Sequence, residues 1–140
     1  EVDWVTGACL LVRRAVYEQI GGFDQGFFMY SEELDYCRRA VAAGWRVVYM
    51  PEAAFYHFEG KSSEQAAPER HLRFQRSKIR YFRKYHGRLV AFALWLFLLV
   101  SYAYQLALEA AKGLLGHKRA MRRERVRAYW RVLRGLAGWG

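Results

Sequence analysis

Ser31-Glu32-Glu33-Leu34-Asp35 places three carboxylates in five residues, directly after the aromatic, glycine-containing segment 23–30. Ser31 is a favourable N-cap residue, and acidic side chains in a first helical turn interact well with the helix dipole. The pattern therefore predicts a helix that begins after Ser31, continues through Ala42 and ends at Gly44. On periodicity alone, capping and a solvated helix start account for these acids. Cation binding or acid–base chemistry is the alternative.

The segments around this helix alternate between strand-like and helix-like patterns. Residues 5–12 form a short apolar run with a glycine that is typical of a buried strand or a strand edge. Residues 13–20 carry apolar side chains at helical spacing, and Gly21-Gly22 ends that helix. Residues 46–50 and 53–58 are rich in apolar and aromatic side chains and predict two further strands. This alternation predicts an α/β fold.

The charge is distributed unevenly along the chain. Residues 1–69 contain 6 Lys/Arg against 11 Asp/Glu, whereas residues 70–140 contain 17 Lys/Arg against 2 Asp/Glu. A half this basic requires an anionic partner, such as a phospholipid surface, nucleic acid or a phosphorylated substrate. Hydrophobic residues make up 54% of the chain, which excludes a disordered protein. Cys9 and Cys37 are too few for a disulfide framework and are predicted to be buried free thiols.

Residues 89–108 form a stretch of 20 residues without a charge, after a basic helical segment at 69–86. Such a stretch is long enough to cross a hydrocarbon core of about 30 Å, and a core helix of a larger bundle is the alternative. Eight Lys/Arg lie between Arg70 and Arg88, and nine between Lys112 and Arg134. Because the positive-inside rule keeps both flanks cytoplasmic, an in-plane or re-entrant hairpin is at least as compatible as a spanning helix.

The last segment, residues 109–140, is predicted to form a basic amphipathic helix. Its apolar stripe consists of Val126, Tyr129, Trp130, Leu133 and Leu136. A helix with such a stripe and arginines opposite is typical of binding to an anionic membrane surface. We therefore expect residues 87–140 to associate with the cytoplasmic face of the cell membrane, as a peripheral or an integral part.

Five short motifs follow one another in the first part of the chain: WVTGACLLVRR from Trp4, GGFD from Gly21, FMYSEELDYCRR from Phe28, AGWRVVYMP from Ala43, and His57. Their order resembles the second half of the catalytic domain of family 2 glycosyltransferases. The rhamnosyl- and galactofuranosyl-transferase-like members are the most similar. The resemblance covers about residues 2–86 and implies the C-terminal portion of a GT-A domain, on the acceptor side, within residues 1–86. A helical, membrane-associated tail would follow.

The resemblance also implies roles for individual residues. In such enzymes the second member of the acidic pair deprotonates the acceptor hydroxyl, and that residue is Glu33 here. Relatives usually carry Glu-Asp at this pair, and the side chain of Glu33 is longer than that of the usual Asp by one methylene. Glu32 or Asp35 could therefore share the deprotonation of the acceptor. Trp4, Gly7 and the loop formed by Gly22, Phe23 and Asp24 would shape the pocket for donor and acceptor.

A divalent cation, Mg²⁺ or Mn²⁺, is the cofactor that the resemblance implies. His57 matches the position where some relatives use a histidine to ligate the metal, beside an Asp-x-Asp motif that this sequence does not contain. The expected reaction is a single in-line displacement that inverts the anomeric configuration. It would move a sugar from a nucleotide-diphosphate donor to a glycan or lipid-linked acceptor of the cell envelope. We expect the chain to be an incomplete part of the enzyme, inactive alone.

Two other functions are compatible with parts of the sequence. A non-enzymatic membrane adaptor would use the same basic tail and leave the acids of residues 31–35 as capping residues. A nucleic-acid-binding module would use the positive charge and the interleaved aromatics of the second half. The uncharged run between two basic flanks is poorly suited to tracking a duplex, so we expect no nucleic-acid partner.

Overall fold

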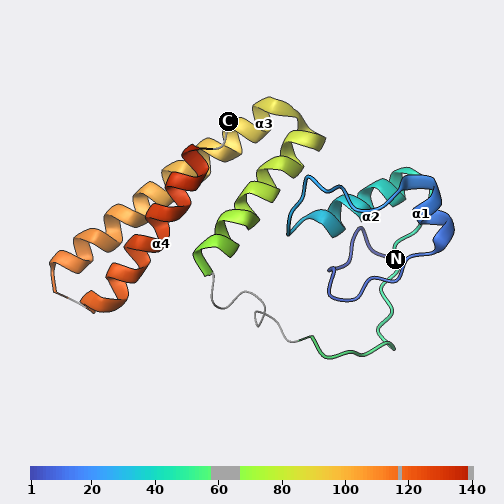
Figure 1. Ribbon diagram of the computed structural model, residues 1–140, viewed down its shortest axis with the longest axis horizontal. Helices are drawn as coiled ribbons and strands as arrows, with labels where there is room; N and C mark the ends of the chain where they lie inside the picture. The colour runs from blue at the N-terminus through green and yellow to red at the C-terminus, as the bar shows by residue number, and fades with distance from the viewer. Residues whose placement is uncertain (58–66, 117, 139–140) are drawn as a thin grey trace. The chain divides into compact units, whose positions relative to one another are not determined.

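The computed structural model describes residues 1–57, 67–116 and 118–138, and this part of the chain contains four helices (Figure 1). Contacts divide the chain into two compact units, Glu1–Ser62 and Ser63–Gly140. Helices α1 and α2 belong to the first unit, and α3 and α4 to the second. The predicted boundary between a catalytic and a membrane-associated part, at residues 86 and 87, stays a prediction and falls within α3.

Both helices of the first unit lie where the sequence predicts them. α1 spans Arg14–Ile20 and α2 spans Glu32–Ala42. Gly21 ends α1 with a φ of 75°, and its N–H donates to the Tyr17 carbonyl at 2.8 Å. The two helices share a small apolar core, in which the buried residues are Val16, Tyr36 and Ala40. Cys37 is buried as predicted, whereas the prediction for Cys9 is wrong because its side chain is exposed.

The predicted strands do not form in the described residues. Residues 5–12, 46–50 and 53–57 are irregular, and residue 58 lies outside the described part of the chain. A backbone hydrogen bond of 3.0 Å joins the N–H of Val2 to the carbonyl of Val47. A strand needs a neighbouring strand to satisfy its backbone groups, and these segments find none among the described residues. The α/β prediction is therefore not confirmed, and the described fold is helical.

α3 spans Ala67–Leu114 and contains a sharp break at Gly87, where φ is 87° and ψ is 172°. This backbone conformation is essentially restricted to glycine. The break separates a basic segment, residues 67–86, from a largely apolar segment, residues 88–114. The two segments fold back on each other, because Gln75 Nε2 donates to the Tyr102 hydroxyl at 3.1 Å and His71 also hydrogen-bonds that hydroxyl. The helices predicted at 69–86 and 89–108 are confirmed, and the hairpin between them is an additional finding.

α4 spans Arg119–Ala137 and packs along α3. Val132 and Leu136 are 2% and 0% exposed, and they share a core with buried residues of both segments of α3. Tyr129 and Leu133 also pack against this core. The predicted apolar stripe of α4 therefore faces α3 over much of its length, and Trp130 is the member of the stripe that is 58% exposed.

The last turn of α4 is held by side chains of α3. Trp95 Nε1 donates to the carbonyl of Leu136 at 3.1 Å, and Arg76 Nη2 donates to the carbonyl of Gly135 at 2.7 Å. Carbonyls at a helix C-terminus have no partner within the helix, so these bonds satisfy groups that would otherwise need water. The end of α4 is thus fixed both by apolar packing and by polar contacts.

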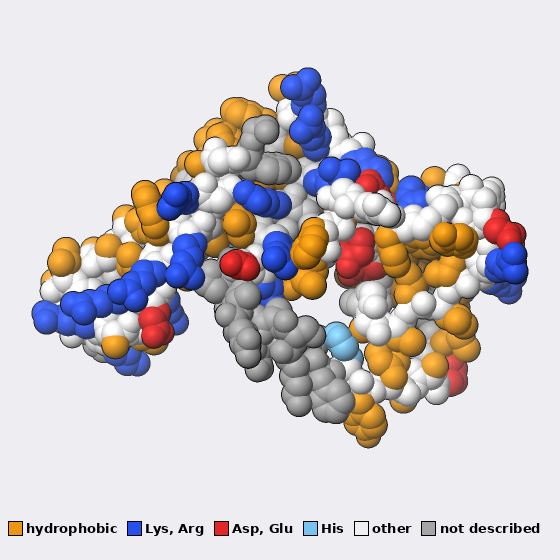
Figure 2. All heavy atoms as spheres, viewed as in Figure 1, with side chains coloured by type: hydrophobic (Ala, Val, Ile, Leu, Met, Phe, Trp, Pro, Cys, Tyr) orange, Lys and Arg blue, Asp and Glu red, His pale blue; other side chains and the backbone are white. Residues whose placement is uncertain are grey.

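The apolar segment of α3 leaves one face uncovered. By length and composition, one helix in the described residues could cross a membrane, and 17% of its most apolar window is buried within the protein. The outer apolar face consists of the exposed residues Leu89, Val90, Phe92, Leu96, Phe97, Val100, Tyr104 and Leu108. Figure 2 shows hydrophobic side chains along one edge of the α3–α4 pair and a row of Lys and Arg side chains beside them. The second unit therefore has distinct apolar and basic surfaces.

Candidate active site

α2 begins immediately after two non-glycine residues in the left-handed region. Tyr30 has a φ of 71° and Ser31 a φ of 67°. This conformation costs a residue with a Cβ roughly 1–2 kcal/mol. The predicted cap by Ser31 is wrong, because its side chain makes no capping hydrogen bond and a capping residue needs an extended backbone. Strained backbone concentrates at functional sites, and here it immediately precedes the acidic pair.

Glu32 and Glu33 carry carboxylate oxygens that are buried and unsatisfied. The Oε2 atom of each residue accepts no hydrogen bond from the described residues. Burial raises the pKa of Glu32, and the charge of Glu33 raises it further, although a hydrogen bond from the backbone of Glu32 acts in the opposite direction. Leaving a polar group buried without a partner is unfavourable. The pair is therefore arranged to take up a proton or a hydrogen-bond donor.

Gly7 lies against the side chain of Glu33. A Cβ at Gly7 would be 3.6 Å from the Cβ of Glu33 and 3.9 Å from its Cγ and Cδ. A side chain larger than methyl would therefore press on the stem that carries the carboxylate. The structure thus brings together two residues that the sequence assigns to the pocket and to the base.

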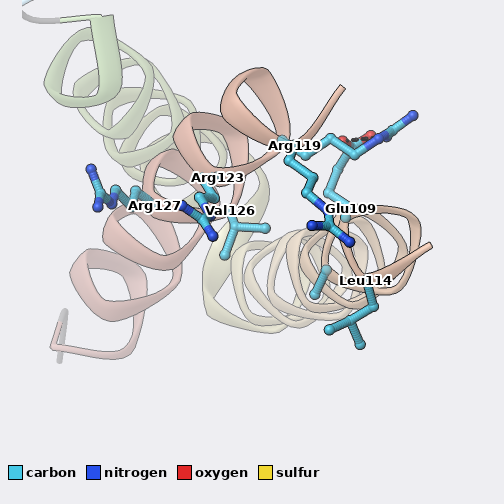
Figure 3. Close-up of a pocket in the computed structure, with 9 residues that line it drawn as sticks. Glu109, Leu114, Arg119, Arg123, Val126 and Arg127 are labelled. Carbon is cyan, nitrogen blue, oxygen red and sulfur yellow. Dashed lines mark hydrogen bonds and ion pairs between the residues drawn. The ribbon is translucent and has the colours of Figure 1, made fainter. Parts of the chain in front are cut away.

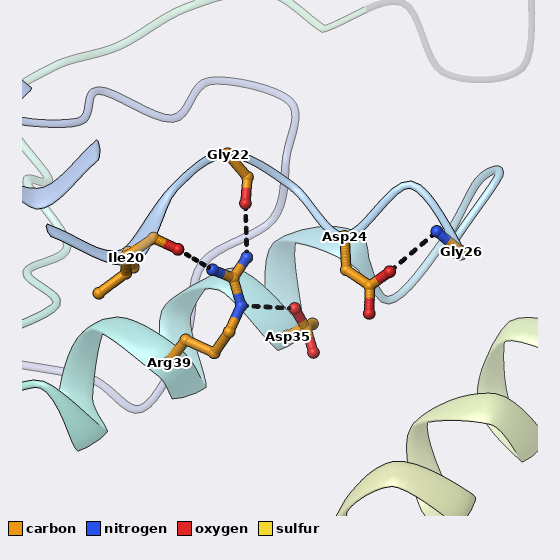
Figure 4. A network of polar contacts seen from close by, with 6 residues as sticks. All are labelled: Ile20, Gly22, Asp24, Gly26, Asp35 and Arg39. Atoms are coloured by element: carbon orange, nitrogen blue, oxygen red, sulfur yellow. Dashed lines mark hydrogen bonds and ion pairs between the residues drawn. The ribbon is translucent and has the colours of Figure 1, made fainter. Parts of the chain in front are cut away.

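Asp35 is completely buried and forms an ion pair, so its surroundings differ from those of Glu33. Arg39 Nε donates to Asp35 Oδ2 at 2.8 Å. The other guanidinium nitrogens of Arg39 donate to the carbonyls of Ile20 and Gly22, both at 2.7 Å (Figure 4). Asp35 therefore orients an arginine that ties the end of α1 and the glycine loop to α2.

The loop after Gly22 is fixed by an aromatic contact and by a turn. The ring centroid of Phe23 lies 5.1 Å from that of Tyr36, which is buried. Asp24 accepts the N–H of Gly26 on Oδ1 at 2.9 Å, so its carboxylate closes an Asx-type turn (Figure 4). The Tyr36 hydroxyl is buried and has no hydrogen-bond partner among the described residues. Burial raises the pKa of this phenol, and the nearby Arg39 acts against that shift.

Among the described residues, no hydrogen bond, ion pair or ring contact joins Trp4 or His57 to this arrangement. Trp4 is 45% exposed, and His57 is exposed. In the described part of the chain, no group of three or more His, Cys, Asp or Glu side chains could hold a metal ion. His57 therefore offers a single candidate ligand, and its role stays a prediction.

The sequence motifs did not indicate a role for Arg39 or Tyr36 in the site. The spacing of Asp35 and Arg39, four residues apart on a helix, is a signal that could have indicated the ion pair. The contacts of Arg39 with Ile20 and Gly22 join distant parts of the sequence, so no local pattern reveals them.

Comparisons with known proteins identify the family to which the chain belongs. Residues 1–77 match the protein family described as "Glycosyltransferase like family 2". The match covers more than half of the chain, and the chain therefore belongs to this family of glycosyltransferases. Membership supports a GT-A domain, although the described residues contain helices and no strand. No solved structure shows significant similarity to the chain.

Curated relatives include named rhamnosyltransferases. The N-acetylglucosaminyl-diphospho-decaprenol L-rhamnosyltransferase of Mycobacterium tuberculosis (strain ATCC 25618 / H37Rv) is 45% identical over 71 residues, which cover 51% of this chain and 23% of that protein. Rhamnosyltransferase WbbL of Escherichia coli (strain K12) is 44% identical over 57 residues, covering 41% of this chain and 22% of WbbL. The O-antigen biosynthesis protein RfbC of Myxococcus xanthus is 38% identical over 66 residues, covering 46% of this chain and 5% of RfbC. The chain thus spans less than a quarter of the length of these relatives.

Proposed function

We propose that this chain forms the acceptor side of an inverting glycosyltransferase, in which Glu33 is the general base. The observation that carries the proposal is the unpartnered, buried Oε2 of Glu33 at the start of α2, in a chain of family 2. The carboxylate would take the proton of the acceptor hydroxyl as that oxygen attacks the anomeric carbon. The nucleotide diphosphate would leave from the opposite face, so the configuration inverts.

The neighbours of Glu33 support this role by their positions. Gly7 leaves the stem of Glu33 uncrowded on one side, and Glu32 adds a negative charge beside it. Asp35 and Arg39 would act as positioning residues, because their contacts hold the glycine loop against α2. Phe23, which is 50% exposed beside this loop, would offer an apolar surface to a sugar ring.

A sugar nucleotide donor and a glycan or lipid-linked acceptor are the substrates that we propose. The support is the similarity to rhamnosyltransferases, one of which has a diphospho-decaprenol acceptor in its name. A divalent cation would neutralise the leaving diphosphate in such a reaction. The described residues do not by themselves fit a metal site, since His57 stands without two further ligands among them.

We also propose that the second unit lies in the plane of the cytoplasmic membrane surface. The outer apolar face of α3 would contact acyl chains, and its most apolar window is mostly uncovered by protein. α4 packs antiparallel along the same segment, since Glu109 binds Arg122 near one end and Trp95 binds Leu136 near the other. A bilayer-crossing α3 would carry the arginines of α4 into hydrocarbon, where each costs about 2.5–3.5 kcal/mol.

The test of the catalytic proposal is Glu33→Gln in the natural protein, assayed with a radiolabelled sugar nucleotide and membranes as the acceptor source. Removing a general base should lower the turnover number by about 10²–10⁴-fold with little change in donor affinity. Glu52→Gln is the matched control, because it is the same substitution at an exposed glutamate outside α2. Turnover of Glu33→Gln equal to that of the control would assign the base to another residue.

A further inference from the structure

A cleft between the end of α3 and the start of α4 is lined by arginine side chains. Its volume is about 380 Å³, which lies in the range of roughly 300–1,000 Å³ that is typical of small-ligand sites. One wall comes from α3, with Glu109, Gly113 and Leu114, and the other comes from α4 (Figure 3). The arginines that line it are Arg119, Arg122, Arg123 and Arg127. None of these residues belongs to the candidate active site.

Glu109 forms an ion pair with one of the four arginines, Arg122. Arg122 Nη1 donates to Glu109 Oε2 at 2.7 Å, and Arg125, outside the cleft, approaches Glu109 Oε1 at 3.5 Å. Both carboxylate oxygens of this buried glutamate are thus engaged. The pair fixes the back of the cleft, where a Cβ added to Gly113 would lie 3.8 Å from the Cβ of Arg122. The helices therefore approach closely at this point.

Arg119, Arg123 and Arg127 line the cleft and are exposed. They are spaced four residues apart and therefore follow one face of α4. In the part of the chain that the structure describes, these three guanidinium groups have no carboxylate partner. Four guanidinium groups and one carboxylate leave the cleft with a net charge of +3. Guanidinium groups bind phosphate oxygens in a bidentate manner, so this arrangement suits a phosphate-bearing ligand.

The rim of the cleft favours a lipid over a free anion. Leu114 lines the cleft and is 84% exposed, and the next residue, Leu115, is 85% exposed. The outer apolar face of α3 ends at Leu108, about 9 Å before Leu114 at a helical rise of 1.5 Å per residue. A site for a soluble phosphate gains nothing from exposed leucines at its edge. A lipid headgroup places its phosphate and its acyl chains within such a distance of each other.

We propose that this cleft binds the phosphate headgroup of an anionic membrane lipid, which anchors the α3–α4 pair at a defined place on the membrane. Arg119, Arg123 and Arg127 contact the phosphate oxygens, and Leu114 contacts the apolar part of the same lipid. The Glu109–Arg122 pair keeps the two walls together. The proposal rests on the membrane association proposed above and is independent of sugar transfer.

The test compares two double variants of the full chain that remove the same charge from the same helix. Arg123→Gln/Arg127→Gln removes two of the three exposed arginines that line the cleft, whereas Arg131→Gln/Arg134→Gln removes two exposed arginines outside it. Binding is measured by flotation with vesicles of phosphatidylcholine alone and of phosphatidylcholine mixed with phosphatidylglycerol. General attraction to the anionic surface falls by a similar factor in both variants. The cleft predicts a further loss of at least about tenfold for Arg123→Gln/Arg127→Gln, confined to the anionic vesicles.

Each other outcome overturns the proposal in a distinguishable way. Equal losses in the two variants would show that only the overall charge of α4 matters. Equal binding of the unchanged chain to both kinds of vesicle would leave membrane association intact and exclude a site for an anionic lipid headgroup. No binding to either vesicle would reject membrane association itself. Calorimetry measures the affinity of the unchanged chain for inorganic diphosphate. If this affinity is at least as high as that for the anionic vesicles, the cleft is a site for a free anion.

Discussion

Tyr30 and Ser31 show how much local strain the start of α2 contains. Both residues hold a positive φ that a glycine would adopt more easily, and Ser31 makes no capping bond in return. The next two residues, Glu32 and Glu33, each bury a carboxylate oxygen without a partner. Strain and unsatisfied charge at adjacent positions both reduce stability. Their coincidence is the pattern expected of a turn that takes part in chemistry.

Replacing Ser31 by glycine should raise the free energy of unfolding by about 0.5–1 kcal/mol, because glycine occupies the left-handed region without a steric cost. Urea unfolding followed by tryptophan fluorescence measures the change. Ser31→Ala is the control, and it should have little effect because the hydroxyl makes no capping bond. A loss of about 1 kcal/mol in Ser31→Ala would instead mean that the serine caps α2.

Glu32→Gln should change the dependence of stability on pH. The pKa of Glu32 in the folded chain is raised above its ordinary value of 4.5, first by burial and then by the charge of Glu33. Such a group contributes stability that is fully present below its unfolded pKa and is lost as the pH rises through the folded pKa. Glu32→Gln should therefore be more stable than the unchanged chain at pH 7, and this advantage should disappear at pH 4. A melting-temperature difference that stays constant between these pH values would contradict the assignment.

At the scale of elements, Arg39 connects three segments of the first unit. Its guanidinium group donates to Asp35 within α2, to Ile20 at the end of α1 and to Gly22 in the following loop. Apolar packing of Val16 on Tyr36 and Ala40 also joins the two helices. The position of the glycine loop relative to the acidic pair therefore depends on one buried carboxylate and one arginine.

Arg39→Met should lower the free energy of unfolding by about 3 kcal/mol, because it leaves the buried Asp35 without its counter-ion. Arg38→Met, on the exposed neighbouring position, should change it by less than about 1 kcal/mol. Chemical denaturation measures both. In the double variant Asp35→Asn/Arg39→Met the loss should be smaller than the sum of the single losses, since the two groups interact. Additive losses would show that the ion pair is energetically unimportant.

At the scale of the whole molecule, the two units have separate cores and different surfaces. The first contains the acidic helix start, and the second combines an outer apolar face with an arginine-lined cleft. Gly87 is decisive for the second unit, since its break lets the two segments of α3 fold back and share a core with α4. The same hairpin that buries part of α4 leaves the outer face of α3 uncovered.

The in-plane orientation can be tested with cysteines at Arg88 and Lys112. Both positions are exposed, lie outside the outer apolar face and are near the two ends of the apolar segment. In a Cys9→Ser/Cys37→Ala background bound to sealed vesicles, a membrane-impermeant maleimide should label both positions from outside. A spanning helix would place one of the two inside the vesicle. Protection of one position until the vesicles are opened with detergent would therefore contradict the in-plane arrangement.

Features that depend on neighbours along the chain could be predicted from the sequence. The helices at Arg14–Ile20 and Glu32–Ala42 and the helix-ending role of Gly21 follow from periodicity and from the conformational freedom of glycine. The strands could not be confirmed, because a strand exists only with a partner and none lies among the described residues. The sequence predicts that Glu32 and Glu33 lie at the start of a helix. Only the folded chain shows that Gly7 lies against Glu33.

The family, the acidic helix start, the long apolar stretch and the basic charge of the second half can all be read from the sequence alone. Each of these features depends only on adjacent or periodically spaced residues. The folded chain shows which acid forms an ion pair and which keeps a carboxylate oxygen without a partner. Asp35 binds Arg39, and Arg39 reaches the carbonyls of Ile20 and Gly22, whereas Glu33 keeps an unpartnered oxygen. Tertiary structure also decided that α4 packs on α3 and closes an arginine-lined cleft. These outcomes depend on groups far apart in sequence, and only folding brings such groups within contact distance.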